Sequence, residues 1–173
     1  YDANGNRLSV EDATGHTVSY TYNADDQVLS QTVYTTPAQG VVGQSGYVAP
    51  SGAQTTYYVY DSSDRLSYVV DPLGNVMEHD YTTTGGLTVL SNTQHYVGVA
   101  YSLIGLSPST PPSLSQLQSW VASAPVQATL AHALRTDYSY DVRGQLTKQT
   151  QWDTLGSNGV GTLTGDAGAT VTT

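Results

Sequence analysis

The sequence predicts an all-β protein made of repeated antiparallel hairpins, with a small helical insertion. The first observation is composition: the chain has 14 Tyr, two Trp and no Phe, and Tyr, like Val and Thr, favours half-exposed strands. The second is the supply of turn residues, with 17 Gly among 173 residues, several of them close to Asp or Asn. The third is an internal repeat of hairpin length. These observations favour a sheet of regularly spaced strands and turns.

Charge and hydropathy exclude several classes of function. Charged residues make up 11% of the chain, against about 25% in typical domains. A formal net charge of -9 leads us to expect no nucleic-acid partner. The longest apolar stretch, Tyr96–Leu106, contains two glycines and is shorter than the roughly 18 residues of a membrane helix, so we expect no membrane span. The lack of Cys excludes disulfides and thiolate metal sites.

The repeat consists of Tyr-Asp pairs and glycines at fixed spacing. Tyr1 and Tyr22 are 21 residues apart, as are Tyr60 and Tyr81. In both copies an Asp follows the leading Tyr by eleven residues, and a Gly follows it by fourteen. A partial third copy spans 138–146. We assign a structural role in the repeat to Tyr1, Asp2, Gly5, Asp12, Gly15, Tyr20, Tyr22, Tyr58, Tyr60, Asp61, Asp71, Pro72, Gly74, Tyr81, Tyr138, Tyr140, Asp141 and Gly144.

Each full copy is interpreted as strands joined by two turns. Asp2–Gly5 combines Asx side chains with a Gly that accepts positive φ, which predicts a tight turn. In the second copy the strand 65–70 leads into Asp71–Gly74, where Pro presets φ and ends the strand, and 75–81 forms the next strand. Tyr residues at 20 and 22, 58 and 60, and 138 and 140 form pairs that point to one face of a strand.

Two segments depart from the repeat. Residues 35–55 are rich in Gly, Pro, Gln and Ser and are predicted to be a surface loop that interrupts the hairpin register. Within 106–135, Ser113 fits an N-cap, and apolar residues recur at helical spacing over 114–121 and 126–134, which predicts two short helices packed on the sheet. We therefore expect a repeat sheet at 1–105, a helical insertion at 106–135, and a repeat hairpin with a Gly- and Thr-rich tail at 136–173.

The Tyr-Asp, Asp-Pro-x-Gly and Tyr-x-Tyr-Asp motifs at this spacing resemble the YD repeat of the Rhs family, which includes bacterial polymorphic toxins, insecticidal toxin-complex subunits and teneurins. The resemblance covers about 1–34, 56–90 and 137–153. It implies a long sheet that spirals into a hollow shell, which in bacterial members encloses a C-terminal toxin domain. We accordingly expect a fragment of a large secreted or cell-surface bacterial protein, in contact with neighbouring YD repeats of its parent chain.

No residue pattern predicts an enzyme. The four His, at 16, 79, 95 and 132, lack metal-ligand spacing, and Asp2, Asn4 and Asn6 resemble only the start of a calcium loop. Asp71–Gly74 resembles half of the aspartate pair with which bacterial Rhs proteins cleave themselves, but the same residues form an ordinary turn of the repeat. We expect no catalytic residue, cofactor or metal.

The tyrosine rows leave a second class of function open. Aromatic side chains beside Asn, Gln and Asp can stack on sugar rings, so an outward row would form an adhesive or carbohydrate-binding module. The alternative role is cross-strand stabilisation, about 0.2–1 kcal/mol per pair, which we favour. A third possibility is a self-assembling extracellular fibre, because unpaired sheet edges allow association with identical chains. The direction of the tyrosine face and the oligomeric state stay open at this point.

Overall fold

The computed structural model describes residues 1–152, 155–156, 161 and 169–172. The chain divides into two compact units, the first made of Tyr1–Val59 and Leu103–Pro112, and the second of Tyr60–Ser102 and Ser113–Thr173. Both units are built of antiparallel strands, and the described part of the chain adds only short helices. The all-β prediction with a small helical insertion is therefore confirmed.

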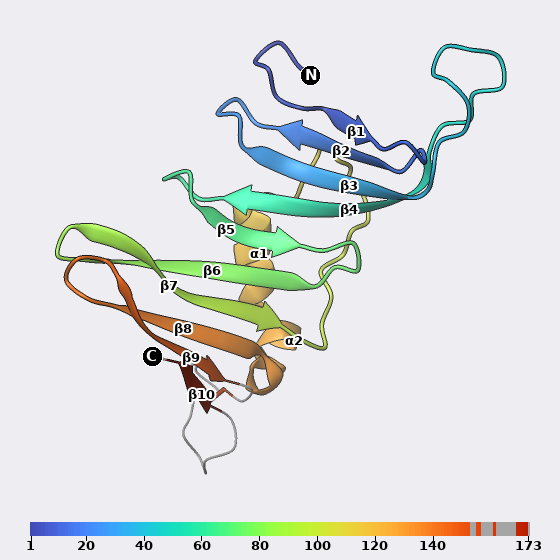
Figure 1. The fold of residues 1–173 in the computed structure, drawn as a ribbon. Coiled ribbons are helices and arrows are strands. Elements are labelled where there is room, and N and C mark those ends of the chain that lie inside the picture. The colour runs from blue at the N-terminus through green and yellow to red at the C-terminus, as the bar shows by residue number, and fades with distance from the viewer. Residues whose placement is uncertain (153–154, 157–160, 162–168, 173) are drawn as a thin grey trace. The chain divides into compact units, whose positions relative to one another are not determined.

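The first unit is a meander in which the strands follow sequence order. Its strands are β1 (Ser9–Glu11), β2 (Thr17–Tyr22), β3 (Val28–Thr36) and β4 (Ser51–Tyr60), whose last residue is grouped with the second unit. Each strand pairs antiparallel with the next (Figure 1). Val10 lies opposite Val18, and Val18 lies opposite Val33. The β-branched residues of these strands thus form one row across the sheet.

The segment between β3 and β4 differs from the prediction. A loop over 35–55 was expected to break the register, but β3 and β4 remain paired as far as Thr36 and Ser51. The connection is therefore limited to 37–50 and extends a continuous hairpin (Figure 1). Thr35 and Thr36 are β-branched and continue the strand, so the loop begins only at Pro37, which has no N–H to donate to a ladder.

The second unit continues the same meander pattern. It contains β5 (Leu66–Val70), β6 (Val76–Thr84), β7 (Leu87–Tyr96), β8 (Leu134–Tyr140), β9 (Leu146–Trp152) and β10 (Ala169–Thr172). Each strand pairs antiparallel with its successor in the chain. Strand β10 lies within the tail that was expected to be Gly- and Thr-rich, and most of that tail lies outside the described residues.

The helices of the insertion cover fewer residues than the apolar spacing of the sequence predicted. Helix α1 (Leu114–Val121) begins at a capping box between Ser113 and Gln116, and α2 (Ala124–Gln127) and a 3₁₀ turn, η1 (Leu130–His132), follow it. The second helix was predicted to reach Leu134. That boundary is wrong, because Leu134 opens β8 and pairs with His95. Pairing with the edge of β7 outweighs the helical spacing of three apolar residues.

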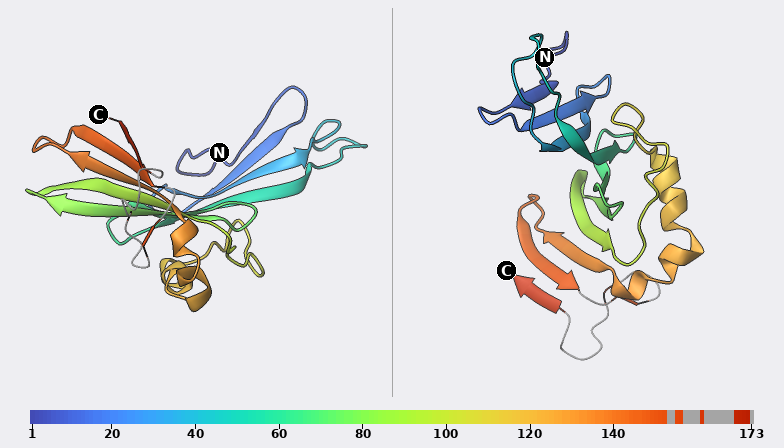
Figure 2. Two further views of the ribbon diagram at one scale, coloured as in Figure 1. Left: turned by 90° about the horizontal axis from the view of Figure 1, so that it is seen from below. Right: turned by 90° about the vertical axis from the view of Figure 1, so that its right-hand side faces the viewer.

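The helices cover one face of the second unit, as Figure 2 shows. Val70 and Val76 on the sheet and Leu117 and Val126 in the helical segment are fully buried. Trp120 meets the ring of Tyr96 edge-on, with centroids 5.5 Å apart. Burial of these apolar side chains is the main force that holds the helical segment on the strands.

The first unit buries hydroxyl groups alongside the apolar side chains of Tyr57 and Val59. Ser30 and Thr32 on β3 are almost completely buried. Ser30 shares a hydrogen bond of 2.8 Å with Thr21, and Thr32 shares one of 2.8 Å with Thr55. Thr21 also donates to the backbone oxygen of Pro108, at 2.8 Å. Each buried hydroxyl therefore has a partner, as a dry environment requires.

Candidate functional site

The turn of the repeat is held by one Asx side chain. At Asp71 the backbone N–H donates to the Asn75 oxygen and the backbone oxygen accepts from the Gly74 N–H, both at 3.0 Å. The Asp71 Oδ1 atom accepts from the N–H groups of Leu73 and Asn75, at 2.8 and 2.9 Å. Gly74 has a φ of 82°. This geometry is a type I turn followed by a residue in the left-handed region, and Asx and Gly suit its two ends.

The same turn occurs six times among the described residues. Its five-residue frame begins at an Asx residue, and the side chain always accepts from the N–H groups two and four residues later. The frames are 2–6, 12–16, 23–27, 61–65, 71–75 and 141–145. The turn at Asp2–Gly5, read from the sequence, has this geometry, and residues 1–8 form no strand.

Two aspartates occupy the frame position that is glycine in the other four turns. Asp26 and Asp64 stand fourth in their frames, with φ values of 61° and 59°. The left-handed region costs an L-residue about 1–2 kcal/mol, and Asp tolerates it better than most because its short side chain bonds locally. Sequence reasoning placed Asn23 at the head of a copy but missed these two residues. Each lies three residues after an Asx residue, Asn23 or Asp61, and this spacing could have identified the left-handed position.

Hydrogen bonds to the turn carboxylates favour the ionised form. The pKa of Asp2 is lowered chiefly by the backbone N–H of Asn6, and that of Asp141 chiefly by the N–H of Gln145. At Asp71, burial acts in the opposite direction, but the Asn75 side chain and the backbone N–H groups of the turn still lower the pKa. Ionised carboxylates thus hold these turns near neutral pH.

A tyrosine in each full copy ties its strand to the backbone of an earlier segment. Tyr22 donates its hydroxyl to the backbone oxygen of Arg7 at 2.8 Å, and Tyr81 donates to that of Leu66 at 3.0 Å. In both cases the acceptor lies 15 residues earlier. The strand register shifts immediately before each of these tyrosines, and such a bulge reorients side chains. We call this contact the tyrosine latch.

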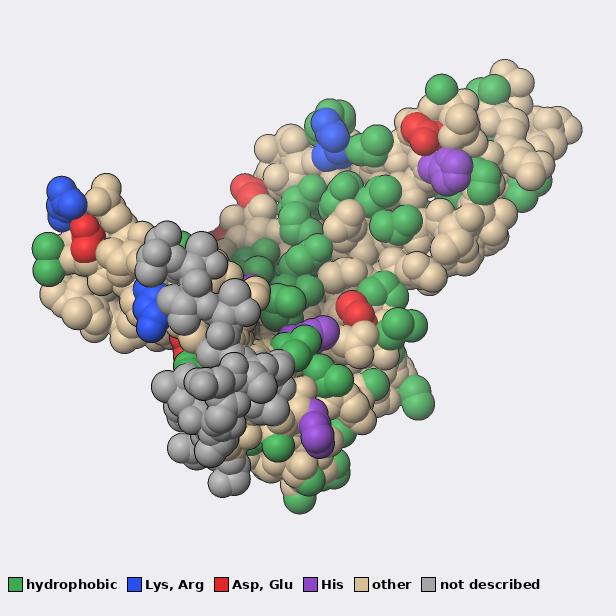
Figure 3. All heavy atoms as spheres, turned by 60° about the horizontal axis from the view of Figure 1, so that its bottom comes forward, with side chains coloured by type: hydrophobic (Ala, Val, Ile, Leu, Met, Phe, Trp, Pro, Cys, Tyr) green, Lys and Arg blue, Asp and Glu red, His purple; other side chains and the backbone are tan. Residues whose placement is uncertain are grey.

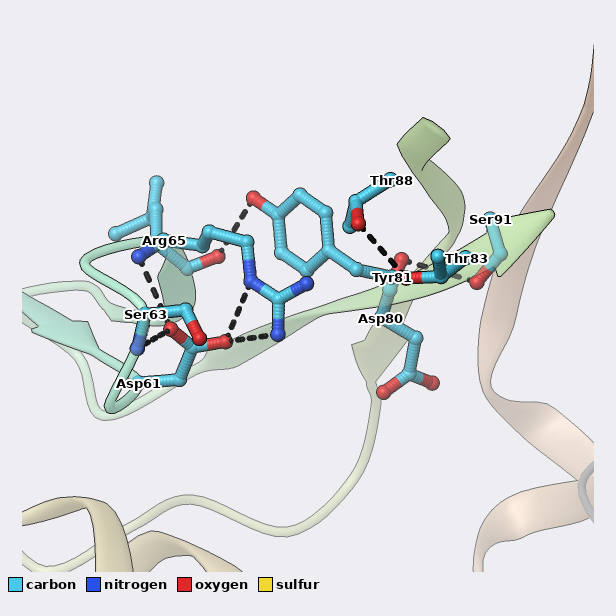
Figure 4. Close-up of polar contacts among 9 residues, drawn as sticks. Asp61, Ser63, Arg65, Asp80, Tyr81, Thr83, Thr88 and Ser91 are labelled. Atoms are coloured by element: carbon cyan, nitrogen blue, oxygen red, sulfur yellow. Dashed lines mark hydrogen bonds and ion pairs between the residues drawn. The ribbon is translucent and has the colours of Figure 1, made fainter. Parts of the chain in front are cut away.

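In the second copy an ion pair covers the latch. Arg65 donates from Nε to Asp61 Oδ2 at 2.8 Å, and its Nη2 atom lies 2.6 Å from the same oxygen. The guanidinium carbon is 4.7 Å from the centroid of the Tyr81 ring, a cation–π distance. Figure 4 shows Arg65 between Asp61 and the ring, with the Tyr81 hydroxyl on a backbone oxygen. Burial, followed by the charge of Asp61, raises the pKa of Tyr81.

The glycine fourteen residues after the leading Tyr of each full copy receives the backbone of a later segment. The N–H of Ala38 donates to the Gly15 oxygen at 2.9 Å, and the N–H of Tyr101 donates to the Gly74 oxygen at 2.8 Å. A Cβ atom on either glycine would overlap the backbone oxygen of its partner, whereas beside Gly5 a Cβ atom would meet no atom within 4 Å. The sequence identified these glycines by spacing, but the close approach to a distant segment is visible only in three dimensions.

A half-buried carboxyl group, that of Glu78, lines a cleft together with residues of helix α1. The hydroxyls of Tyr68 and Tyr96 both donate to the Glu78 carboxylate, and burial raises the pKa of Glu78 despite these bonds. Tyr68 and Tyr96 have raised pKa values, first through burial and also through contact with Glu78. A polar cleft of about 230 Å³ lies beside this group, with walls that include Asp80 and Gln118. No pattern in the sequence pointed to Glu78.

The remaining tyrosines of the assigned set have separate environments. Tyr58 donates to the side chain of Gln31 at 3.1 Å, and Tyr20 lies opposite Gln31 on the neighbouring strand. Tyr138 and Tyr140 line an apolar pocket of about 240 Å³ together with Leu87 and Val142. Tyr1 and Tyr60 lie outside these contacts: Tyr1 precedes β1 and is 79% exposed, and Tyr60 ends β4.

The histidines are dispersed. His16 Nδ1 is 2.7 Å from the hydroxyl of Thr14, whereas the buried Nδ1 of His79 has no hydrogen-bond partner. Within the described ranges, no three His, Asp or Glu side chains are grouped so that they could hold a metal ion. Charged side chains are few on the face in Figure 3. In the part of the chain that the structure describes, no helix is long and apolar enough for a membrane span.

Comparison with known protein families identifies a repeat in the first part of the sequence. The family model described as RHS Repeat matches residues 1–41. Residues 1–41 are therefore similar to an Rhs repeat. The matched Rhs repeat contains three of the turns, the Tyr22 latch and the docking of Ala38 on Gly15. Residues 60–101 have the same latch and docking contacts.

A solved structure matches most of this chain, but with low sequence identity and a low TM-score. The structure titled "Crystal Structure of TcdB2-TccC3-Cdc42" matches with 14% sequence identity and a TM-score of 0.33. The match covers 80% of this chain and 6% of that chain, so the present chain spans a small part of its length. A search of curated proteins found no match. In architecture, the chain is a structural Rhs-type scaffold, because its recurring contacts join strands and turns.

Proposed function

We propose that this chain is wall material of a β-shell that encloses or delivers a toxin, within a large secreted or cell-surface bacterial protein. The observation that supports this function is the recurrence of the latch and the glycine docking in both full copies of the repeat. A repeat whose unit contacts recur can extend a sheet by adding further units. The neighbouring repeats of the parent chain are then the main partners of this segment.

Electron microscopy of the parent protein tests the shell. We expect the strands of this segment to curve around a closed volume that contains density for the toxin domain. A matched control is the parent protein without its C-terminal domain, which should keep the wall and lose the internal density. An open sheet or a fibre in place of a closed wall would contradict the proposal.

We further propose that the segment has no enzymatic role. The carboxylates that resemble reactive groups serve structure: both oxygens of Asp71 accept hydrogen bonds within its own turn. If the parent protein cleaves itself, Asp71→Asn should leave the fragment pattern on a denaturing gel unchanged. Loss of a fragment with this variant, with Asp12→Asn as the matched control, would assign Asp71 to the cleavage reaction.

The alternative functions receive less support from the contacts. The hydroxyls of Tyr22, Tyr58 and Tyr81 bond to groups of the sheet itself, which favours cross-strand stabilisation over a sugar-binding row. We therefore expect no signal on a glycan array and a monomer in sizing experiments. Glycan binding that disappears with Tyr20→Ala would support the adhesin, and a growing oligomer would support the fibre.

A further inference from the structure

Two turns of the first unit, frames 2–6 and 23–27, are joined side chain to side chain. The Nδ2 atoms of Asn4 and Asn6 donate to Asp26 Oδ1, at 2.8 and 2.6 Å. Asp26 holds the left-handed position of frame 23–27, where four of the six frames have glycine. We call these three residues the clasp. It connects turns that begin 21 residues apart, at Asp2 and Asn23.

One residue of the clasp is followed by a glycine with an open environment. Asn4 and Gly5 are both exposed, and the space beside the Gly5 Cα is empty to 4 Å. The Gly5 N–H donates to the Asp2 oxygen at 3.2 Å, a longer bond than the 3.0 Å found for Gly15, Gly74 and Gly144. The turn precedes β1 and lies outside any strand, so it can open without disrupting a ladder.

We propose that Asn4 is a deamidation site and that its conversion releases the clasp. The Gly5 nitrogen, after losing its proton to solvent base, attacks Asn4 Cγ. A bond forms between these atoms, the Cγ–Nδ2 bond breaks, and Nδ2 leaves as ammonia. Water then opens the succinimide to aspartate or isoaspartate, with no oxidation or reduction. The product has no amide to donate, and its carboxylate is repelled by that of Asp26.

The chain contains its own control for the rate. Asn23 heads an equivalent turn, but the residue after it is Ala24, whose Cβ hinders approach of the nitrogen, whereas glycine offers no such obstacle. The sequence has a second Asn-Gly pair at 158–159, outside the described residues. A protease that separates these peptides allows each site to be quantified.

The first test follows the full chain in mildly alkaline buffer by peptide mass mapping and an isoaspartate assay. We expect residue 4 to convert at least about tenfold faster than residue 23, the ratio that a barrier lower by about 1.4 kcal/mol gives. Asn4→Gln should abolish early conversion in that peptide. Equal rates at residues 4 and 23 would overturn the proposal.

The second test measures the consequence for the fold. Asn4→Asp imitates the main product, and at neutral pH we expect it to lower the melting temperature by about 2–4 °C. Adding Asp26→Asn should restore stability, because the introduced amide can donate to the new carboxylate. The proposal is contradicted if Asn4→Asp leaves the melting temperature unchanged, or if Asp26→Asn does not restore a lowered melting temperature. Either result would show that the hydrogen bond from Asn4 to Asp26 does not stabilise the fold.

Discussion

Gly5 and Gly74 occupy the same place in their turns, with φ values of 89° and 82°, but their surroundings differ. No atom lies near a Cβ position at Gly5, whereas the backbone oxygen of Tyr101 blocks that position at Gly74. Backbone strain alone therefore explains glycine at residue 5, while strain and close packing together require it at residue 74.

This difference gives a matched pair of variants. Gly5→Ala should lower the free energy of unfolding by about 1–2 kcal/mol through the left-handed backbone alone. Gly74→Ala should lower it by about 3 kcal/mol or more, because the Tyr101 segment must also move. Urea denaturation of both variants measures the difference. Equal losses would show that docking on Gly74 contributes nothing.

The tyrosine latch can be tested by removing one oxygen atom. Tyr81→Phe deletes the donor to the Leu66 oxygen and should cost about 0.5–1.5 kcal/mol in the free energy of unfolding. Tyr1→Phe is the control, since Tyr1 is 79% exposed, and it should leave stability unchanged. If the Tyr81→Phe variant is as stable as the parent chain, the latch does not contribute to the stability of the fold.

At the scale of elements, helix α1 depends on its first turn. The Ser113 hydroxyl accepts from the Gln116 N–H, and the Gln116 side chain accepts from the Ser113 N–H. Ser113→Ala should destabilise the protein by about 1 kcal/mol, as measured by thermal denaturation. Ser119→Ala, on the exposed side of the same helix, should be neutral. If both variants behave alike, the capping box is not a source of stability.

At the scale of the whole molecule, two kinds of carboxyl group impose opposite pH dependences. The turn aspartates have lowered pKa values, so their contribution exists above the unfolded value of about 3.8 and is lost as pH falls through the folded pKa values. The pKa of Glu78 is raised from 4.5, so its contribution exists below that value and is lost as pH rises through the folded pKa.

Stability should therefore fall on both sides of a maximum in the acid range. Glu78→Gln should flatten the loss on the alkaline side of that maximum, whereas Asp71→Asn should flatten part of the loss on the acid side and keep its turn, as Asn23 does. Urea midpoints measured as a function of pH check both limbs. A Glu78→Gln profile that runs parallel to the original on the alkaline side would contradict this assignment.

The sequence predicts the parts of this fold that depend on local chemistry. Asp71, Gly74 and Tyr81 could be placed by spacing, because a turn requires Asx and left-handed residues at fixed positions. The clasp at Asp26 and the half-buried Glu78 could not, because each depends on partners ten or more residues away on other turns or strands. Leu134 shows the same limit: helical spacing is local, whereas its strand is set by pairing with His95.

The hydroxyl interior of the first unit has a thermal consequence. Exposure of apolar surface raises the heat capacity of unfolding, and exposure of polar surface lowers it. The first unit buries the hydroxyl groups of Ser30 and Thr32 beside few apolar side chains, whereas the second buries a larger apolar set that includes Val70 and Val76. The first unit should therefore contribute less heat capacity per residue. Its stability should change little between cold and warm conditions, so that low temperature weakens the valine-lined interior before it weakens the hydroxyl-lined one.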